Sequence, residues 1–274
     1  MSHWSLADIP WNEYDPAKVD PDLLRIVKAA SMVEINADDY VRYLERVFAG
    51  DPKLLTAIAY WGEEEAQHGA ALAAWAHRAD PNFDFAAARH AFSQGFRIDT
   101  DAERSIRGSR TGELVARCVV ETGTSSFYTA LADAAAEPVL RFICRKIAAD
   151  ELRHYKLFYE GAKQYQKAEG LSAWSRMKVA LGRIVESDDD ELAYAYYAAN
   201  GETAPYERKR WNQEYAARAY AVYRRPHIDR GMAMILKAVG LTPTGWLHRV
   251  VSAVAWAFMR RRARSLSRYR LGPV

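Results

Sequence analysis

The chain contains two copies of the four-residue pattern Glu-x-x-His, and a single Glu precedes each copy by about thirty residues. The six residues, in chain order, are Glu34, Glu65, His68, Glu121, Glu151 and His154. Residues three apart lie on the same side of an α-helix, so each copy directs one carboxylate and one imidazole toward the same point. The repeated order predicts two related pairs of helices.

Apolar residues recur with helical periodicity in four runs, at about residues 21–50, 52–79, 111–136 and 138–161 or beyond. Each of the six Glu and His residues falls on the apolar side of its run. A short connection separates the two runs of each pair, as in antiparallel neighbours, and a longer crossover separates the pairs. We therefore expect an all-α fold, with the six side chains inside a bundle of four long helices.

A single Glu on such a run is ordinarily a solvated surface carboxylate. Four at matching depths are different, because a buried carboxylate is costly unless it is paired or coordinates a metal. Four carboxylates and two imidazoles inside a four-helix bundle form the ligand set of a ferritin-like di-iron or di-manganese centre. Mixed oxygen and nitrogen ligands suit these metals better than structural zinc, but they do not decide between iron and manganese.

The residues around the pattern also resemble a known family. Residues 146–154 contain the run Ile-Ala-Ala-Asp-Glu-x-Arg-His, residues 61–69 surround the first Glu-x-x-His, and residues 121–124 read Glu-x-x-Thr. These segments are similar to the metal-binding helices of the soluble acyl-carrier-protein desaturases, closely in the first segment and more loosely in the second. The resemblance covers about residues 25–165.

The resemblance implies a role for each ligand. Glu65 and Glu151 would bridge two iron ions, Glu34 and Glu121 would be terminal ligands, and His68 and His154 would each serve one iron. It also places two further residues, Thr124 and Asp150, at the site. Thr124 would lie beside the oxygen-binding position, although its hydroxyl can equally bond back to the preceding helical turn.

A ligating imidazole usually donates its other N–H to a carboxylate or a carbonyl. Asp150, Asp38 and Glu64 are the candidates for this role, and the match to the family ranks Asp150 first. Arg153 either pairs with an acidic neighbour or is solvated.

The activity implied is that of an oxygen-dependent di-iron oxidase, most simply a desaturase. Such an enzyme introduces a double bond into an acyl chain carried by acyl carrier protein or coenzyme A, with dioxygen as co-substrate and electrons from a ferredoxin-like donor. Two alternatives remain open. One is a different di-iron oxygenase: a hydroxylase, an N-oxygenase or an aldehyde-deformylating enzyme. The other is a non-catalytic ferritin relative that handles iron or peroxide.

Composition agrees with a globular chain, since 50% of the 274 residues are hydrophobic and 27% are charged. We expect one domain over residues 1–274, with a core bundle at about 21–165 and additional helices at about 170–270. The first residues lack the pattern of a signal peptide, and no apolar stretch has the length of a membrane span, so we expect a cytoplasmic protein. We also expect a homodimer.

Arginines gather in two places outside the motifs. In the crossover these are Arg89, Arg97, Arg104, Arg107 and Arg110, and at the C-terminal end Arg260, Arg261, Arg262, Arg264, Arg268 and Arg270. Either group could contact an acidic carrier protein, and the C-terminal group could lie on an anionic membrane. For the crossover, an ordinary solvated surface is the favoured interpretation. For the C-terminal group, a helix docked on the bundle with a solvated basic tail is equally consistent. The net charge of +3 is too small to indicate nucleic-acid binding.

Overall fold

The computed structural model describes residues 4–98, 100, 102, 104–186, 190–201 and 205–270, and every regular element in these ranges is helical. The α-helices are α1 (Pro21–Ile35), α2 (Ala37–Val47), α3 (Pro52–Ala79), α4 (Phe85–Gly95), α5 (Arg110–Ala134), α6 (Pro138–Glu169), α7 (Ala173–Glu186), α8 (Asp190–Asn200), α9 (Arg208–Ala219), α10 (Arg225–Ala238) and α11 (Trp246–Leu266). The all-α expectation is confirmed.

The long helices that carry the motifs begin and end at residues with clear stereochemical reasons. Both α3 and α6 have proline in the first turn, where no intrahelical N–H is required. The side chain of Asp51 accepts the backbone N–H of Leu54 at 3.0 Å and caps α3. Glu137 caps α6 in the same way, and Gly170 ends it in the left-handed conformation with φ +62°.

The first apolar run forms two helices rather than one. The run at residues 21–50 is interrupted at Asn36, where the backbone N–H turns back to the carbonyl of Val33 at 3.1 Å and separates α1 from α2. At this point α1 lies very close to α3, because a Cβ atom placed on Gly69 would be 2.8 Å from the backbone nitrogen of Ile35. The expectation of a single first helix was therefore wrong, and Glu34 lies at the end of α1.

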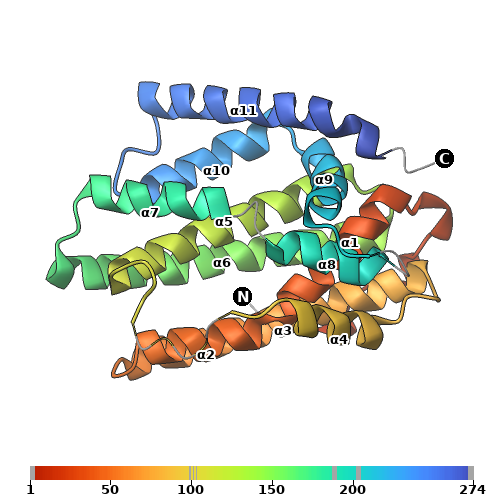
Figure 1. Cartoon of the computed structure of the whole chain (residues 1–274), viewed down its shortest axis with the longest axis horizontal. Coiled ribbons are helices and arrows are strands. Elements are labelled where there is room, and N and C mark those ends of the chain that lie inside the picture. Colours follow the sequence, from red (N-terminus) through yellow and green to blue (C-terminus); the bar gives the residue numbers. More distant parts are fainter. Residues whose placement is uncertain are drawn as a thin grey trace.

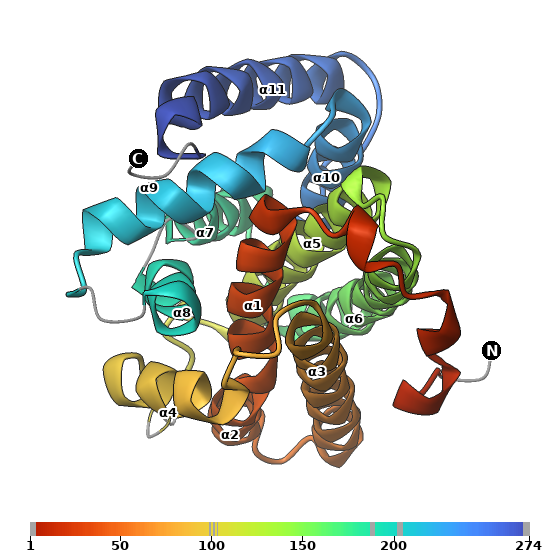
Figure 2. The same ribbon diagram turned by 90° about the vertical axis from the view of Figure 1, so that its right-hand side faces the viewer.

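Two helix pairs, α1 with α3 and α5 with α6, pack along their lengths, and α3 also contacts α6 (Figures 1 and 2). The C-terminal helices cover this assembly from one side: α10 packs on α5, α8 on α1, and α11 on α10 and α9. Both views place α11 at one edge of the molecule and α3 toward the opposite side. Among the described helices, none is both long enough and apolar enough to cross a membrane.

Two apolar clusters fill the interior at different levels along these helices. One cluster includes Met32, Trp75 and Ile147, and the other includes Ile58 and Phe158. On α3, α5 and α6 the Glu and His residues of the motifs lie between the segments that contribute to the two clusters. The polar residues therefore form a layer inside the protein, with apolar packing on both sides of it.

Candidate metal centre

The six residues singled out by the sequence pattern converge in this polar layer. Glu34 comes from α1, Glu65 and His68 from α3, Glu121 from α5, and Glu151 and His154 from α6. All six are buried, with no residue more than 6% exposed. They form two groups of four, in each of which the potential ligand atoms lie within 4.8 Å of one another.

The two groups share two carboxylates. One contains Glu34, Glu65, His68 and Glu151, and the other contains Glu65, Glu121, Glu151 and His154. Each group therefore has three carboxylates and one imidazole, and Glu65 and Glu151 belong to both. This is the arrangement that two neighbouring cations with shared carboxylate ligands require.

Both imidazoles turn the same ring nitrogen toward the centre. The Nδ1 atom of His68 lies 3.3 Å from Oε1 of Glu151, and that of His154 lies 3.0 Å from Oε1 of Glu65. None of these approaches has the geometry of a hydrogen bond: within the described residues, Nδ1 of each imidazole and one oxygen each of Glu121 and Glu151 are buried without a hydrogen-bond partner. Buried polar atoms are rarely left unpaired, and a cation at the centre would satisfy all four.

The other ring nitrogen of each imidazole bonds to a carboxylate in the layer outside. Nε2 of His68 lies 3.0 Å from Asp150, and Nε2 of His154 lies 2.9 Å from Glu64. A hydrogen on Nε2 leaves Nδ1 with a free lone pair, which is the tautomer a metal needs. Of the three candidates from the sequence, Asp150 and Glu64 occupy this position, whereas Asp38 is exposed on α2 and does not.

Arg153 links these two outer carboxylates. Its guanidinium bonds to Asp150 and, at 2.7 Å, to Glu64. Asp150 also accepts the indole N–H of Trp4 at 2.6 Å. Trp4 lies far from the motifs in the sequence, and no neighbouring pattern predicts its contact with Asp150.

Two hydroxyl groups contact carboxylates of the site. The Thr124 Oγ1 atom lies 2.5 Å from Oε2 of Glu151 and 3.2 Å from the carbonyl oxygen of Glu121. The hydroxyl therefore contacts both a carboxylate of the site and its own helix; a place beside an oxygen-binding position stays a prediction. The Tyr128 hydroxyl donates to Glu34, and this tyrosine was also missed.

The charges of the metal-free site are strongly coupled. Burial, together with the nearby charge of Glu65, raises the pKa of Glu34, and burial with the charges of Glu151 and Glu65 raises the pKa of Glu121. Burial alone would lower the pKa of His68, but the surrounding carboxylates, first Asp150 and then Glu151, raise it well above its usual value. In the absence of metal, protons therefore compensate part of the negative charge, and cations would replace them.

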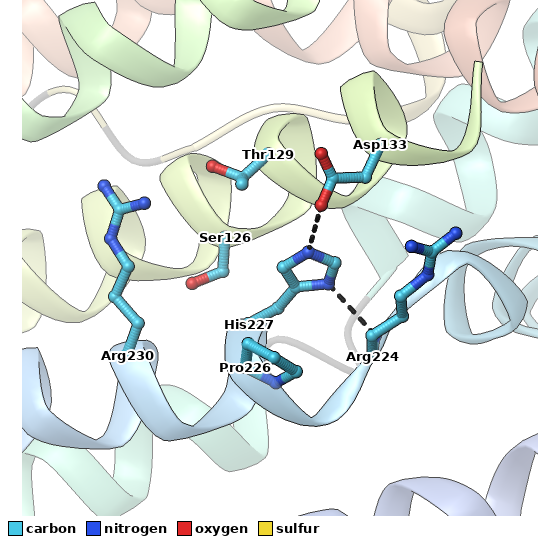
Figure 3. Close-up of a pocket in the computed structure, with 7 residues that line it drawn as sticks. All are labelled: Ser126, Thr129, Asp133, Arg224, Pro226, His227 and Arg230. Carbon is cyan, nitrogen blue, oxygen red and sulfur yellow. Dashed lines mark hydrogen bonds and ion pairs between the residues drawn. The ribbon is translucent and has the colours of Figure 1, made fainter. Parts of the chain in front are cut away.

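A second polar site lies between α5 and α10, around His227 (Figure 3). Its Nε2 atom lies 3.0 Å from Asp133, and its Nδ1 atom accepts the backbone N–H of Arg224 at 3.0 Å. Both ring nitrogens are thus in use, which leaves none to bind a metal or to activate Ser126 across the pocket. His227 holds the start of α10 against α5, and the helical pattern of the sequence did not indicate this role.

Arginines of the crossover make contacts within the chain. Arg107 forms two bonds of 2.6 Å with Glu186 of α7, and Arg110 donates to the backbone carbonyl of Val47 at 2.9 Å. These two side chains hold the crossover and α5 in place.

A scan against protein-family models finds no match, and a search of curated proteins finds no significant one. The buried Glu and His groups can hold metal ions.

Proposed function

We propose that the chain forms a ferritin-like four-helix bundle that binds two iron ions and acts as an oxygen-dependent oxidase of acyl chains. The observation that carries the proposal is the pair of overlapping ligand groups that share Glu65 and Glu151. Four ionised carboxylates and two neutral imidazoles carry a charge that two divalent cations balance, so metal binding relieves the cost of burying them. Manganese in one or both positions fits the same ligands.

The protein's own groups would fix the geometry of such a centre. Glu65 and Glu151 would bridge the ions, Glu34 and Glu121 would each bind one, and Asp150 and Glu64 would hold the two imidazoles with Nδ1 inward. The Thr124 hydroxyl, 2.5 Å from Glu151, can donate a proton or a hydrogen bond at the centre. The apolar clusters on both sides would exclude water from it.

The ions would supply the activation of dioxygen needed to remove hydrogen from an unactivated carbon. The choice of an acyl chain as substrate, carried by acyl carrier protein or coenzyme A, rests on the resemblance of residues 121–124 and 146–154 to the desaturase helices. A ferredoxin-like protein would provide the electrons.

The test is a single-turnover reaction. The iron-loaded protein is reduced without oxygen and mixed with candidate acyl thioesters, oxygen is admitted, and the products are identified by mass spectrometry. We expect an alkene two mass units lighter than the substrate, and no product from Glu151→Gln. A hydroxylated or shortened product would instead support another di-iron oxygenase. Iron oxidation with every acyl group recovered unchanged would reject acyl oxidation and favour a ferritin-type role.

A further inference from the structure

Helix α11 presents large apolar side chains on the side that faces away from the rest of the molecule. Trp246 is 70% exposed, Val254 65% and Phe258 64%, and Val250 between them is 51% exposed. These four residues are spaced four apart, so they share one side of the helix, and we refer to them as the apolar row. The row extends over about 18 Å at the usual rise of an α-helix.

The opposite side of α11 is fixed to the protein. Ser252 and Leu266 are buried, and the Nε2 atom of His248 lies 2.8 Å from the backbone carbonyl oxygen of Asp229 in α10. The helix is thus already folded and oriented, with the apolar row outward, and a partner would not have to order it. Helix α11 lies at the edge of the molecule (Figures 1 and 2), and the exposure of the four side chains shows that the row faces solvent.

The end of the chain that carries α11 has a strong excess of positive charge. Residues 230–274 contain nine Lys or Arg residues and no Asp or Glu, whereas the whole chain has a net charge of only +3. The remainder of the protein is therefore net negative. A surface that attracts this end and not the rest of the protein must itself be negatively charged.

Positive charge lies directly beside the apolar row. Arg260, Arg261 and Arg264 line a shallow hollow together with Trp256 and Ala257, the two residues before Phe258. All three arginines are exposed. An anionic group that enters this hollow would contact several guanidinium groups. The apolar row would at the same time contact an apolar part of the same partner, next to the anionic group.

We propose that α11 binds the surface of an anionic lipid membrane, with the apolar row inserted at the level of the acyl chains and Arg260, Arg261 and Arg264 on the lipid phosphates. A bilayer offers anionic phosphates and apolar acyl chains side by side. Its flat surface can also contact the whole length of a helix that lies at the edge of the molecule. Exposed Trp and Phe are suited to this interface. The helix lies on the membrane and does not cross it.

The experiment uses the full chain and vesicles of known composition. Binding is measured by sedimentation with vesicles of phosphatidylcholine alone and of phosphatidylcholine with phosphatidylglycerol in equal parts. We expect binding to the anionic vesicles that weakens as salt is raised. We also expect a loss of about tenfold in affinity for the double variant Val254→Ser/Phe258→Ser and a similar loss for Arg261→Gln/Arg264→Gln.

The matched control is Tyr60→Ser, because Tyr60 is an equally exposed aromatic residue (66%) that belongs to α3 and not to α11. It should bind vesicles like the unaltered protein. Equal binding by the Val254→Ser/Phe258→Ser variant, or no binding to anionic vesicles, would overturn the proposal. So would a dimer, seen by light scattering without lipid, that this variant abolishes. The test needs no turnover, so its outcome is independent of the proposed activity.

Discussion

The Nε2 atom of His68 and the indole nitrogen of Trp4 both contact the same oxygen of Asp150, at 3.0 and 2.6 Å. One carboxylate therefore joins the N-terminal segment to a candidate ligand on α3, although it is itself on α6. The orientation of the His68 ring depends on a residue more than sixty positions earlier in the chain.

Replacing Asp150 by Asn should weaken metal binding without removing a ligand. The amide keeps the shape but not the charge that favours a hydrogen on Nε2 of His68, and losses of about 10- to 100-fold in affinity are typical of such changes. Competition titration with a chromogenic chelator measures the affinity. Asp39→Asn, on α2 where the side chain pairs with Arg42, is the control and should be unchanged. An unchanged affinity in Asp150→Asn would contradict the role assigned to this carboxylate.

Glu151→Gln should reduce metal binding at both positions, because Glu151 belongs to both ligand groups. Glu34→Gln should affect mainly one ion, since Glu34 belongs to a single group. Elemental analysis after dialysis gives the number of ions per chain, which we expect to be about two in the unaltered protein. Glu160→Gln, at an exposed position of α6, should retain both ions. Equal ion contents for Glu34→Gln and Glu151→Gln would argue against the shared position of Glu151.

Thr124→Val should leave the metal content intact and slow the oxygen-dependent reaction. The substitution keeps the volume of the side chain but removes the hydroxyl that lies 2.5 Å from Glu151. A loss of about tenfold in rate corresponds to about 1.4 kcal/mol of transition-state stabilisation. Thr124→Ser, which retains the hydroxyl, should restore most of the rate. If valine and serine behave alike in stopped-flow measurements, the hydroxyl serves only its own helix.

Metal loading should reverse the effect of pH on stability. In the metal-free protein the pKa values of His68 and His154 are raised well above the usual value, by surrounding carboxylates that outweigh the effect of burial. Protonated imidazoles then stabilise the fold fully below about pH 6.5, the unfolded pKa, and this stabilisation is lost as pH rises through the folded pKa. The pKa values of Glu34 and Glu121 are raised too, in their case by burial first of all. Their protonation therefore also stabilises the fold at lower pH, and this stabilisation is lost as pH rises.

Bound cations replace these protons, so the stability gained from metal should increase with pH. Urea unfolding of chelator-treated and manganese(II)-loaded protein between about pH 6.5 and about pH 9 tests both statements. A metal-free protein that becomes more stable over this interval would contradict the prediction.

Gly69→Ala should destabilise the fold by about 1–3 kcal/mol, because the added Cβ atom must displace either α1 or α3. A Cβ at this position would lie 2.8 Å from the backbone nitrogen of Ile35. The matched control is Gly182→Ala in α7, where a Cβ meets no atom within 4 Å. There the better helix propensity of alanine should stabilise the protein by about 0.5–1 kcal/mol. Urea unfolding compares the two, and equal effects would refute the close contact.

The sequence was sufficient to find the six residues because their spacing follows directly from helical geometry. The start of α3 at Pro52 and of α6 at Pro138 could also be predicted, since proline and the preceding acidic cap act locally. The break at Asn36 could not, because it coincides with the close contact between α1 and Gly69, which is not encoded in the periodicity of either helix. Trp4 and Tyr128 were missed for the same reason: their partners are distant in sequence.

The polar layer between the two apolar clusters has a consequence for how the molecule unfolds. Each end of the helix assembly has its own hydrophobic packing, and the carboxylates between them repel one another unless protons or cations are present. With metal bound, the layer would hold both ends together as one cooperative unit. Without metal, and at a pH at which the layer has lost its protons, hydrogen exchange would reveal two regions that open independently.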